Sequence, residues 1–434
     1  MKYDMRIKKA INHQAGPVPL DFGGTAVTGI HVSVVAALRD HYGLEKRPVR
    51  VVEPFQMLGE VEDDLKDAVG IDTVGIFPRT TLFGFALEQW KEWRTPWGQT
   101  VLVPGQFNVT GEGKDVYIYP EGDTALPPSG HMPEGGFFFD TIIRQQPIDE
   151  ERLNPEDNTE EFGPVSEEIL AYFARETKKA VASGRGVVAN FGGTAFGDIA
   201  LVPAPFMKFP KGIRDITEWY VSTAVRQDYV HAIFAKQLSV ALANLERIHA
   251  VVGNQVDAVF LCGTDFGTQH GQFCSTDTFC ELWMPYYAKM NGWIHQYTTW
   301  KTFKHSCGAV EPLMKHFINA GFDIINPVQC SATGMDPRGL KEKYGDQLVF
   351  WGGGVDTQRV LPFGTPAQVR EQVLERCEIF SKRGGFVFDA IHNIQARTPI
   401  DNILAMVNAV HEFNGRGCVP ITESIAEQNI SCCE

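Results

Sequence analysis

An alternation of apolar runs and helix-like segments, repeated about eight times, constrains the fold of this chain more than any other feature. From residue 18 onward, strand-length runs rich in valine, isoleucine and phenylalanine precede segments whose apolar residues recur at helical spacing. The runs are apolar at nearly every position, which is typical of parallel strands buried on both faces. Eight such repeats favour an α/β fold of the closed (β/α)8 barrel, or TIM, type over an open doubly wound sheet. The sequence also lacks the glycine-rich motifs that bind dinucleotides or phosphates.

The alternation predicts approximate limits for each element. Strands are expected at residues 18–24, 72–77, 186–191, 256–262, 300–303, 322–328, 348–353 and 386–391. Before the second of these strands, the apolar residues between Met57 and Val69 fall at helical spacing and predict a helix. We expect the whole chain, residues 1–434, to form a single barrel domain.

Residues 80–165 interrupt this alternation. Trp90, Trp93 and Trp97 lie there among many glycine, proline and aromatic residues, a composition typical of hairpins and turns. The stretch is too long for a simple connection. We therefore expect a β-rich insertion, or flap, over one end of the barrel, whose aromatic residues form either its own core or an apolar wall for a substrate.

Composition excludes several classes of partner. The 434 residues carry a formal net charge of −14, with lysine and arginine scattered, whereas nucleic-acid binding needs concentrated basic surface. No twenty-residue apolar run is present and the N-terminus lacks a signal-peptide pattern, so we expect a cytoplasmic chain with no membrane partner. An odd number of cysteines spread along a chain of this size argues against a disulfide framework. The nine are Cys262, Cys274, Cys280, Cys307, Cys330, Cys377, Cys418, Cys432 and Cys433.

Polar residues at the expected strand ends are the candidates for function, because barrels of this type build their active sites at the C-terminal ends of the strands. The polar residues expected there are Asp21, Thr25, Asn190, Thr194, Asp265, Gln269, His305, Cys307, Asn326, Gln329, Asp356, Gln358, His392, Asn393 and Gln395. Among them we assign catalytic or substrate-positioning roles to Asp265 and Gln269, with an N-cap of the next helix as the alternative for Asp265. Asn326 and Gln329 are assigned to cofactor binding.

His305 and Cys307 are the strongest metal-ligand candidates. Residues two positions apart in a strand point to the same side, so the imidazole and the thiol would face one point together. Both donors suit zinc, and His392 after the last strand would add a third ligand while leaving a fourth position open, as in catalytic zinc sites. The alternative is a chance His-x-Cys whose cysteine packs in the core.

Three segments carry a resemblance to a known family: HSCGAVEPLMKHFINAGFDIINPVQ, GDQLVFWGGGVDTQ and TPIDNILAMVNAVHEFNG. They resemble the uroporphyrinogen-decarboxylase-like superfamily, and specifically its branch of corrinoid-dependent methyltransferases. The likeness spans roughly residues 16–80 and 185–415, and members are (β/α)8 barrels. In the methylcobamide:thiol methyltransferases of this branch the His-x-Cys-Gly turn supplies two zinc ligands, which correspond to His305 and Cys307.

The third ligand departs from that pattern. In the branch it is a cysteine a few residues before a Thr-Pro pair, and counting back from Thr398 places His392 at that position. One thiolate in place of two makes the metal harder and more Lewis-acidic, so an ether or carboxylate oxygen becomes as plausible a ligand as a thiolate. A rival set is implied by the resemblance to corrinoid-dependent O-demethylases, in which two spaced carboxylates and a histidine correspond to Asp356, Glu371 and His392.

The resemblance implies a methyltransferase that moves a methyl group between a small substrate and the cobalt of a separate corrinoid protein. A methoxylated aromatic is one candidate donor, but the donor itself is left open, as is a homodimer; O-demethylation is favoured over thiol methylation. A metal-free decarboxylase and a non-catalytic binding barrel are the alternatives. Decarboxylation is the weaker one, since Arg6 and Arg39 are the only arginines before residue 41, whereas true uroporphyrinogen decarboxylases have an arginine-rich segment there.

Overall fold

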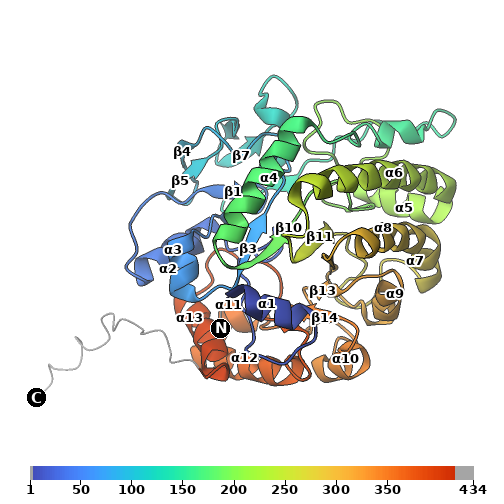
Figure 1. The fold of residues 1–434 in the computed structure, drawn as a ribbon. Coiled ribbons are helices and arrows are strands. Elements are labelled where there is room, and N and C mark those ends of the chain that lie inside the picture. The colour runs from blue at the N-terminus through green and yellow to red at the C-terminus, as the bar shows by residue number, and fades with distance from the viewer. Residues whose placement is uncertain (1–2, 416–434) are drawn as a thin grey trace, which may run out of the picture.

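A curved parallel sheet forms the centre of the molecule. The computed structural model describes residues 3–415 (Figure 1). Seven strands lie side by side in the order β15-β14-β13-β12-β11-β10-β3, and all neighbouring pairs are parallel. They are β3 (Thr73–Ile76), β10 (Gly186–Ala189), β11 (Ala258–Cys262), β12 (Lys301–His305), β13 (Ile324–Asn326), β14 (Val349–Trp351) and β15 (Phe386–Val387).

The segment around Leu20 closes this sheet into a barrel. Leu20 forms a parallel bridge with Phe388, and Phe388 N donates to Pro19 O at 2.8 Å. On the other side, Asp72 N donates to Leu20 O at 2.8 Å, just before β3. The strand predicted at 18–24 is therefore present only as a short bridged segment, but this segment takes the place of the eighth strand of the barrel, between β15 and β3. The predicted (β/α)8 barrel is confirmed.

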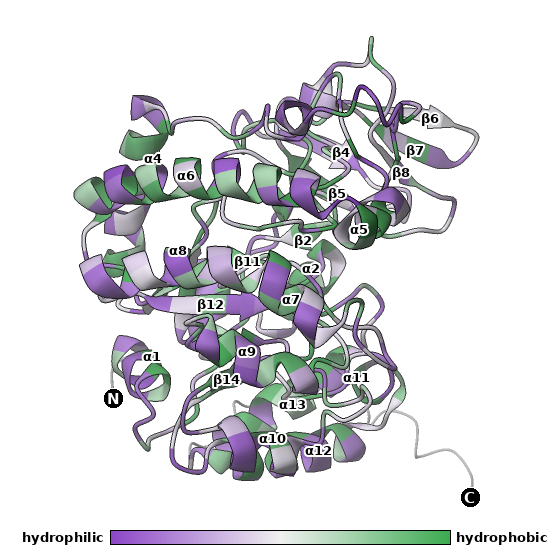
Figure 2. Cartoon of the chain, turned by 90° about the vertical axis from the view of Figure 1, so that its right-hand side faces the viewer, coloured by the Kyte–Doolittle hydropathy of each residue, from purple (hydrophilic) through white to green (hydrophobic). Residues whose placement is uncertain are grey.

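Helices surround the sheet (Figure 1). Around the barrel they are α2 (Val32–His41), α3 (Asp63–Val69), α4 (Glu167–Ala182), α5 (Ile216–Val225), α6 (Gln227–Val252), α7 (Thr276–Leu282), α8 (Met284–Tyr297), α9 (Met314–Asn319), α10 (Pro337–Tyr344), α11 (Val360–Phe363), α12 (Pro366–Phe380) and α13 (Ile400–Phe413). Polar and apolar residues alternate along them in Figure 2, as expected for helices with one buried side.

The first helix packs against the interior of the barrel. α1 (Tyr3–Ile11) buries Ile7, Ala10 and Ile11 in one cluster with Phe303, Trp351 and other strand residues. A Cβ added to Gly186 of β10 would lie 2.6 Å from the Ile7 side chain, so glycine there permits the close approach. Strand residues on the inner face are thus shielded from solvent at the end of the barrel where the strands begin.

The helix predicted from Met57 onward is wrong in its first half. Leu58 and Gly59 form strand β2, which pairs antiparallel with β1 (Val51–Glu53), and the helix begins only at Asp63. A Cβ on Gly59 would lie 3.0 Å from atoms of α2 and of Val49, so the backbone packs too closely there for a helix face. The apolar residues that recur at helical spacing are buried here by the pairing of β1 with β2 and not by a helix.

Two small antiparallel sheets lie within residues 80–165. One pairs β4 (Lys91–Arg94) with β5 (Thr100–Val103), and the other joins β6 (Val109–Glu112), β7 (Asp115–Ile118), β8 (Gly130–Met132) and β9 (Asp140–Thr141). Phe83, Phe107 and Phe139 are buried and pack edge to face or tilted against neighbouring rings. Phe107 and Phe139 of the insertion therefore belong to a local core, whereas Trp90, Trp93 and Trp97 are only partly buried.

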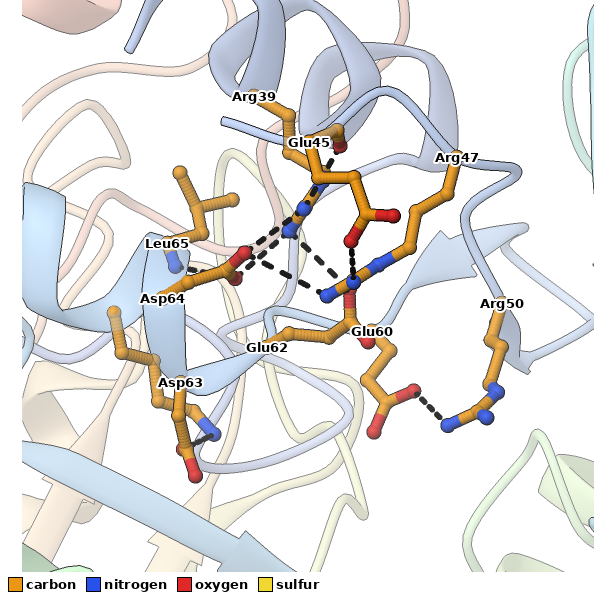
Figure 3. A network of polar contacts seen from close by, with 10 residues as sticks. Arg39, Glu45, Arg47, Arg50, Glu60, Glu62, Asp63, Asp64 and Leu65 are labelled. Carbon is orange, nitrogen blue, oxygen red and sulfur yellow. Dashed lines mark hydrogen bonds and ion pairs between the residues drawn. The ribbon is translucent and has the colours of Figure 1, made fainter. Parts of the chain in front are cut away.

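A cluster of ion pairs joins α2 to α3 (Figure 3). The Arg39 side chain is only 4% exposed, and its two terminal nitrogens lie 2.8 and 2.9 Å from the Asp64 carboxylate. Glu62 lies 3.2 Å from the same guanidinium and also pairs with Arg47, which is 39% exposed. The buried guanidinium thus has its charge balanced by carboxylates on both sides.

Two further observations concern the chain as a whole. The six cysteines within residues 3–415 are free thiols, and Cys418, Cys432 and Cys433 lie outside the described residues. Among the helices described, none combines the length and the apolar composition that a membrane crossing requires.

Candidate metal-binding site at the barrel mouth

Three donor groups converge at the C-terminal end of the barrel. His305 is the last residue of β12, Cys307 follows two positions later, and His392 lies just beyond β15. His305 Nε2 lies 3.3 Å from Cys307 Sγ, and the two imidazole rings are 5.2 Å apart between centroids. One potential ligand atom from each residue lies within 4.8 Å of the others. The structure therefore brings together all three residues that the sequence analysis assigned to metal binding.

The turn that carries Cys307 has a well-defined geometry. Ser306 N donates to Asn326 O at 2.8 Å, and Ser306 Oγ accepts from Phe266 N at 2.9 Å. Gly308 has a φ of 86°, and a Cβ at that position would lie 2.4 Å from the backbone of Gly267. Only glycine permits this approach between the loops that follow β11 and β12. The thiol is thus held beside the imidazole by backbone contacts.

Hydrogen bonds on the histidines decide which nitrogens are available. His305 Nδ1 lies 2.5 Å from Asn326 Oδ1, which accepts only, so the Nδ1 carries the proton and Nε2 presents its lone pair toward Cys307. His392 Nδ1 accepts from Asn393 N at 2.8 Å. A metal bound at that nitrogen would replace the hydrogen bond, whereas one bound at Nε2 would require the Nδ1 to be protonated and the contact to be released.

The protonation states suit a cation. Burial lowers the pKa of both His305 and His392 to about 4, so each imidazole is neutral near pH 7 and keeps one unprotonated ring nitrogen. Burial and the neighbouring Asp265 raise the pKa of the Cys307 thiol. A thiol in such a place becomes a thiolate only when a positive charge compensates it, and a bound metal ion provides that charge. The donor set of two neutral imidazoles and one thiolate therefore fits zinc.

Asp265 lies beside the two β12 donors. Its Oδ1 accepts from Cys307 N at 2.6 Å and lies 3.7 Å from His305 Nε2. It does not cap the following helix, since Ser275 performs that role for α7 through a hydrogen bond from Thr278 N. The N-cap interpretation of Asp265 is wrong, and its position next to the donors is the observed one.

The other two amide candidates, Gln269 and Gln329, form hydrogen bonds with the loops around the donors. Gln329 Oε1 accepts from Gly308 N at 2.8 Å, and its Nε2 donates to Gln269 Oε1 at 2.9 Å. Gln269 Nε2 in turn donates to Ser331 O at 2.6 Å. These contacts connect the turn after β12 to the loops after β11 and β13.

The rival carboxylate set does not converge. Asp356 Oδ1 accepts from the backbone N–H groups of Gln358 and Arg359, so it stabilises its own turn. Glu371 is exposed on α12. Within residues 3–415, the cluster of potential ligand atoms is the one made by His305, Cys307 and His392.

Sequence reasoning missed several polar groups near the site. Lys304 is fully buried and donates to Thr264 O at 2.5 Å and to His305 O at 2.7 Å. Burial, and to a smaller extent the charge of Asp265, raises the pKa of Asp198, in the loop after β10, and of Tyr220, on α5. Lys304 could have been found, because a lysine inside an apolar strand is unusual. Asp198 and Tyr220 carry no such signal, since they lie far beyond their strand end.

Comparisons with known proteins agree with this architecture. The family model described as uroporphyrinogen decarboxylase (URO-D) matches residues 200–413, a range that includes all three donors. The matched range is just under half of this chain. A curated uroporphyrinogen decarboxylase from Pseudoalteromonas translucida is 24% identical over an alignment of 215 positions, which covers 46% of this chain and 57% of that protein. The match thus spans little more than half of the curated relative.

A solved structure extends the likeness beyond the URO-D region. A methyltransferase from Methanosarcina mazei superposes with a TM-score of 0.52 and 15% sequence identity, covering 95% of this chain and 99% of the other. At that identity the match shows a shared fold. The expected resemblance to the uroporphyrinogen-decarboxylase-like superfamily is confirmed over residues 200–413.

Proposed function

We propose that this protein is a corrinoid-dependent methyltransferase, which moves a methyl group between a small substrate and the cobalt of a separate corrinoid protein. The observation that carries the proposal is the convergence of His305, Cys307 and His392 at the barrel mouth, with ligand atoms within 4.8 Å. The shared fold with a methyltransferase supports it, as does the URO-D family region that contains the donors.

The residues present would hold zinc. When bound, zinc supplies Lewis-acid polarisation to the oxygen or sulfur atom that carries or accepts the methyl group. Asn326 keeps the proton of His305 on Nδ1, so Nε2 remains a donor. Asp265 holds the backbone of Cys307 in place beside it. One thiolate with two imidazoles is a harder donor set than two thiolates with one, which favours an ether oxygen and therefore O-demethylation over thiol methylation.

Decarboxylation of a polycarboxylate is the competing function. It requires basic groups that bind the substrate carboxylates, but the two arginines of the first 40 residues are engaged elsewhere. Arg6 lies 2.7 Å from Asp72, and Arg39 lies 2.8 Å from Asp64. Both ion pairs stabilise the barrel, and neither arginine belongs to the donor cluster.

Metal analysis of protein purified without added metal is the first test. We expect about one equivalent of zinc in the wild type and loss of zinc in Cys307→Ala. Cys330→Ala is the matched control, because Cys330 is also a free thiol after a barrel strand, and its Sγ contacts Val328 O. Less than roughly a tenth of an equivalent in the wild type would refute the zinc mechanism. Retention of zinc by Cys307→Ala would instead show that Cys307 is not a required ligand.

Methyl transfer is the second test. The zinc-loaded protein is mixed with a corrinoid protein in the cobalt(I) state and a methoxylated aromatic, and methylation of cobalt is followed by its absorbance change. Methylation that depends on both the aromatic compound and the zinc supports the proposal. Zinc-loaded protein that decarboxylates a polycarboxylate and leaves cobalt unmethylated with every methyl donor would establish the competing function.

A further inference from the structure

The loop that carries His392 is held on both sides of that residue. His392 has a φ of 72°, a left-handed conformation that is uncommon for a residue with a side chain. Before it, Ile391 N donates to Val355 O at 3.0 Å. After it, Asn393 is 1% exposed, and its Oδ1 accepts from Gly29 N at 2.5 Å. A residue in such a conformation persists only where its surroundings fix it, so these contacts hold the third donor in place.

Asn393 also connects this loop to the insertion, residues 80–165. Its Nδ2 donates to Gln56 Oε1 at 2.8 Å. The residue before Gln56 bonds to the insertion, because Phe55 O accepts from Phe139 N at 2.8 Å. Phe55 and Gln56 therefore link the insertion to the residue that directly follows the third donor.

The Glu53 carboxylate fixes the turn that makes this link. It accepts from Phe55 N at 3.0 Å and from Gln56 N at 2.7 Å. The Phe55 ring also lies 6.2 Å from the Phe83 ring of the insertion, measured between centroids. Both residues of the link are thus held through their backbone, and a displacement of the insertion displaces them with it.

His31 makes a second link between the insertion and the same loop. It is 1% exposed, and its Nε2 donates to Phe137 O of the insertion at 3.0 Å. Its backbone N donates to Ile394 O, two residues after His392, at 2.9 Å. Farther along the loop, the Arg397 guanidinium lies 4.6 Å from the centre of the Phe137 ring, a cation–π distance. The insertion therefore contacts the loop of the third donor along residues 393–397.

We infer that the insertion positions the third metal ligand, His392, through Gln56 and His31. This inference rests on the proposed function, which assigns His392 to zinc. His305 and Cys307 come from a single strand end, whereas His392 follows a different strand, so its place beside them depends on the contacts of its own loop. Coupling free energies are reciprocal, so metal binding stabilises the docked insertion by as much as the docked insertion strengthens metal binding.

Substitutions of Gln56 test its positioning role. We expect Gln56→Met to weaken zinc binding about three- to tenfold, because Asn393 loses one of the hydrogen bonds that fix the loop. The visible absorption spectrum of the cobalt(II)-substituted variant should also differ from that of the wild type, because a displaced His392 changes the geometry of the metal. Gln56→Glu keeps an oxygen acceptor for Asn393 Nδ2 and should restore both properties.

Gln227→Met is the matched control for these measurements. Gln227 is also partly buried, and its Nε2 donates to Thr223 O at 3.1 Å, outside the donor cluster. The control should keep the zinc affinity and the cobalt spectrum of the wild type. Zinc affinity of Gln56→Met within a factor of about two of the wild type, together with an unchanged cobalt spectrum, would overturn the role of Gln56.

Hydrogen exchange tests the coupling in the wild type without any substitution. Zinc is added to the metal-free full chain, and exchange of the backbone amides is followed by mass spectrometry. We expect zinc to slow exchange in residues 53–57 and 137–142, because local opening of these segments must release the metal ligand. The effect should be smaller in Gln56→Met, with α4 as the internal reference. Exchange that zinc leaves unchanged in both segments of the wild type would overturn the inference.

The inference and the proposed function fail in distinguishable ways. Absence of zinc from the wild type contradicts both. Normal zinc content, combined with wild-type affinity in Gln56→Met and with exchange in the insertion that does not respond to zinc, would leave the methyltransferase function standing and overturn the inference alone.

Discussion

Replacing Asn326 with alanine tests how the metal-binding imidazole is held. Asn326 is fully buried, its Oδ1 accepts from His305 Nδ1 at 2.5 Å, and its Nδ2 donates to Trp351 O at 2.9 Å. The variant leaves the Nδ1–H and the carbonyl without partners in a dry interior. We expect a loss of about 2–4 kcal/mol of unfolding free energy, and about 10- to 100-fold weaker zinc binding because the ring loses its orientation and its fixed tautomer.

Zinc affinity is measured by competition with a chromophoric chelator, and unfolding free energy by urea titration. Asn402→Ala is the matched control, since Asn402 is also buried and its Nδ2 donates at 2.8 Å to two backbone carbonyls, those of Leu361 and Gly364, away from the site. The control should lose similar stability and keep wild-type zinc affinity. If Asn326→Ala binds zinc within a factor of about two of the wild type, the orienting role is refuted.

Three further variants follow from the structure. Burial raises the pKa of Glu53 from 4.5 to about 7, so the protonated form stabilises the fold and this contribution is lost as the pH rises from 4.5 through 7. Across that window, urea titrations should show the unfolding free energy of the wild type falling by up to about 3 kcal/mol relative to Glu53→Gln. Parallel pH profiles of the two proteins would contradict this. Gly308→Ala should destabilise the protein by about 2–4 kcal/mol and weaken zinc binding, because residue 308 has a left-handed conformation and its new Cβ would lie 2.4 Å from Gly267. A wild-type melting temperature in this variant would show that the turn does not require glycine. Arg39→Ala should lower the unfolding free energy by about 3–5 kcal/mol because it leaves Asp64 and Glu62 without their buried partner. Arg47→Ala, at the exposed edge of the same cluster, should lower it much less, and equal losses in denaturant titrations would refute this distinction.

The barrel could be predicted from the sequence because its strands are buried on both faces. Each strand then appears in the sequence as a continuous apolar run, and each helix as apolar residues repeated at helical spacing. Both patterns can be recognised within the element itself, without knowledge of its partners. The exceptions arise where partners distant in the chain decide the structure. Leu58 and Gly59 form a strand because β1, α2 and Val49 pack around them, and nothing between Met57 and Val69 reveals those contacts.

The donor cluster was predictable for a related reason. His305 and Cys307 are two positions apart at one strand end, so local geometry alone brings them together. His392 was assigned from its place after the last predicted strand, because barrel strands end at the same rim, and the resemblance pointed to the same residue. Asp198 and Tyr220 were not predicted, since each lies on a long loop or helix whose path over the barrel mouth depends on tertiary packing.

The closing contacts of the barrel also set the order in which the chain can fold. Leu20 occupies its place through hydrogen bonds to residues around Asp72 and Phe388, including one from its own N to Asp72 Oδ2 at 2.9 Å, and Asn414 further ties the end of α13 to Val18. During synthesis the N-terminal segment therefore has no sheet partner on one side until nearly the whole chain has left the ribosome. Closure joins residues almost 400 positions apart, so it carries the largest loop entropy in the molecule and should be among the last steps of folding. The donor His392 lies four residues after Phe388, and a metal site complete in all three ligands can form only when that last step is done.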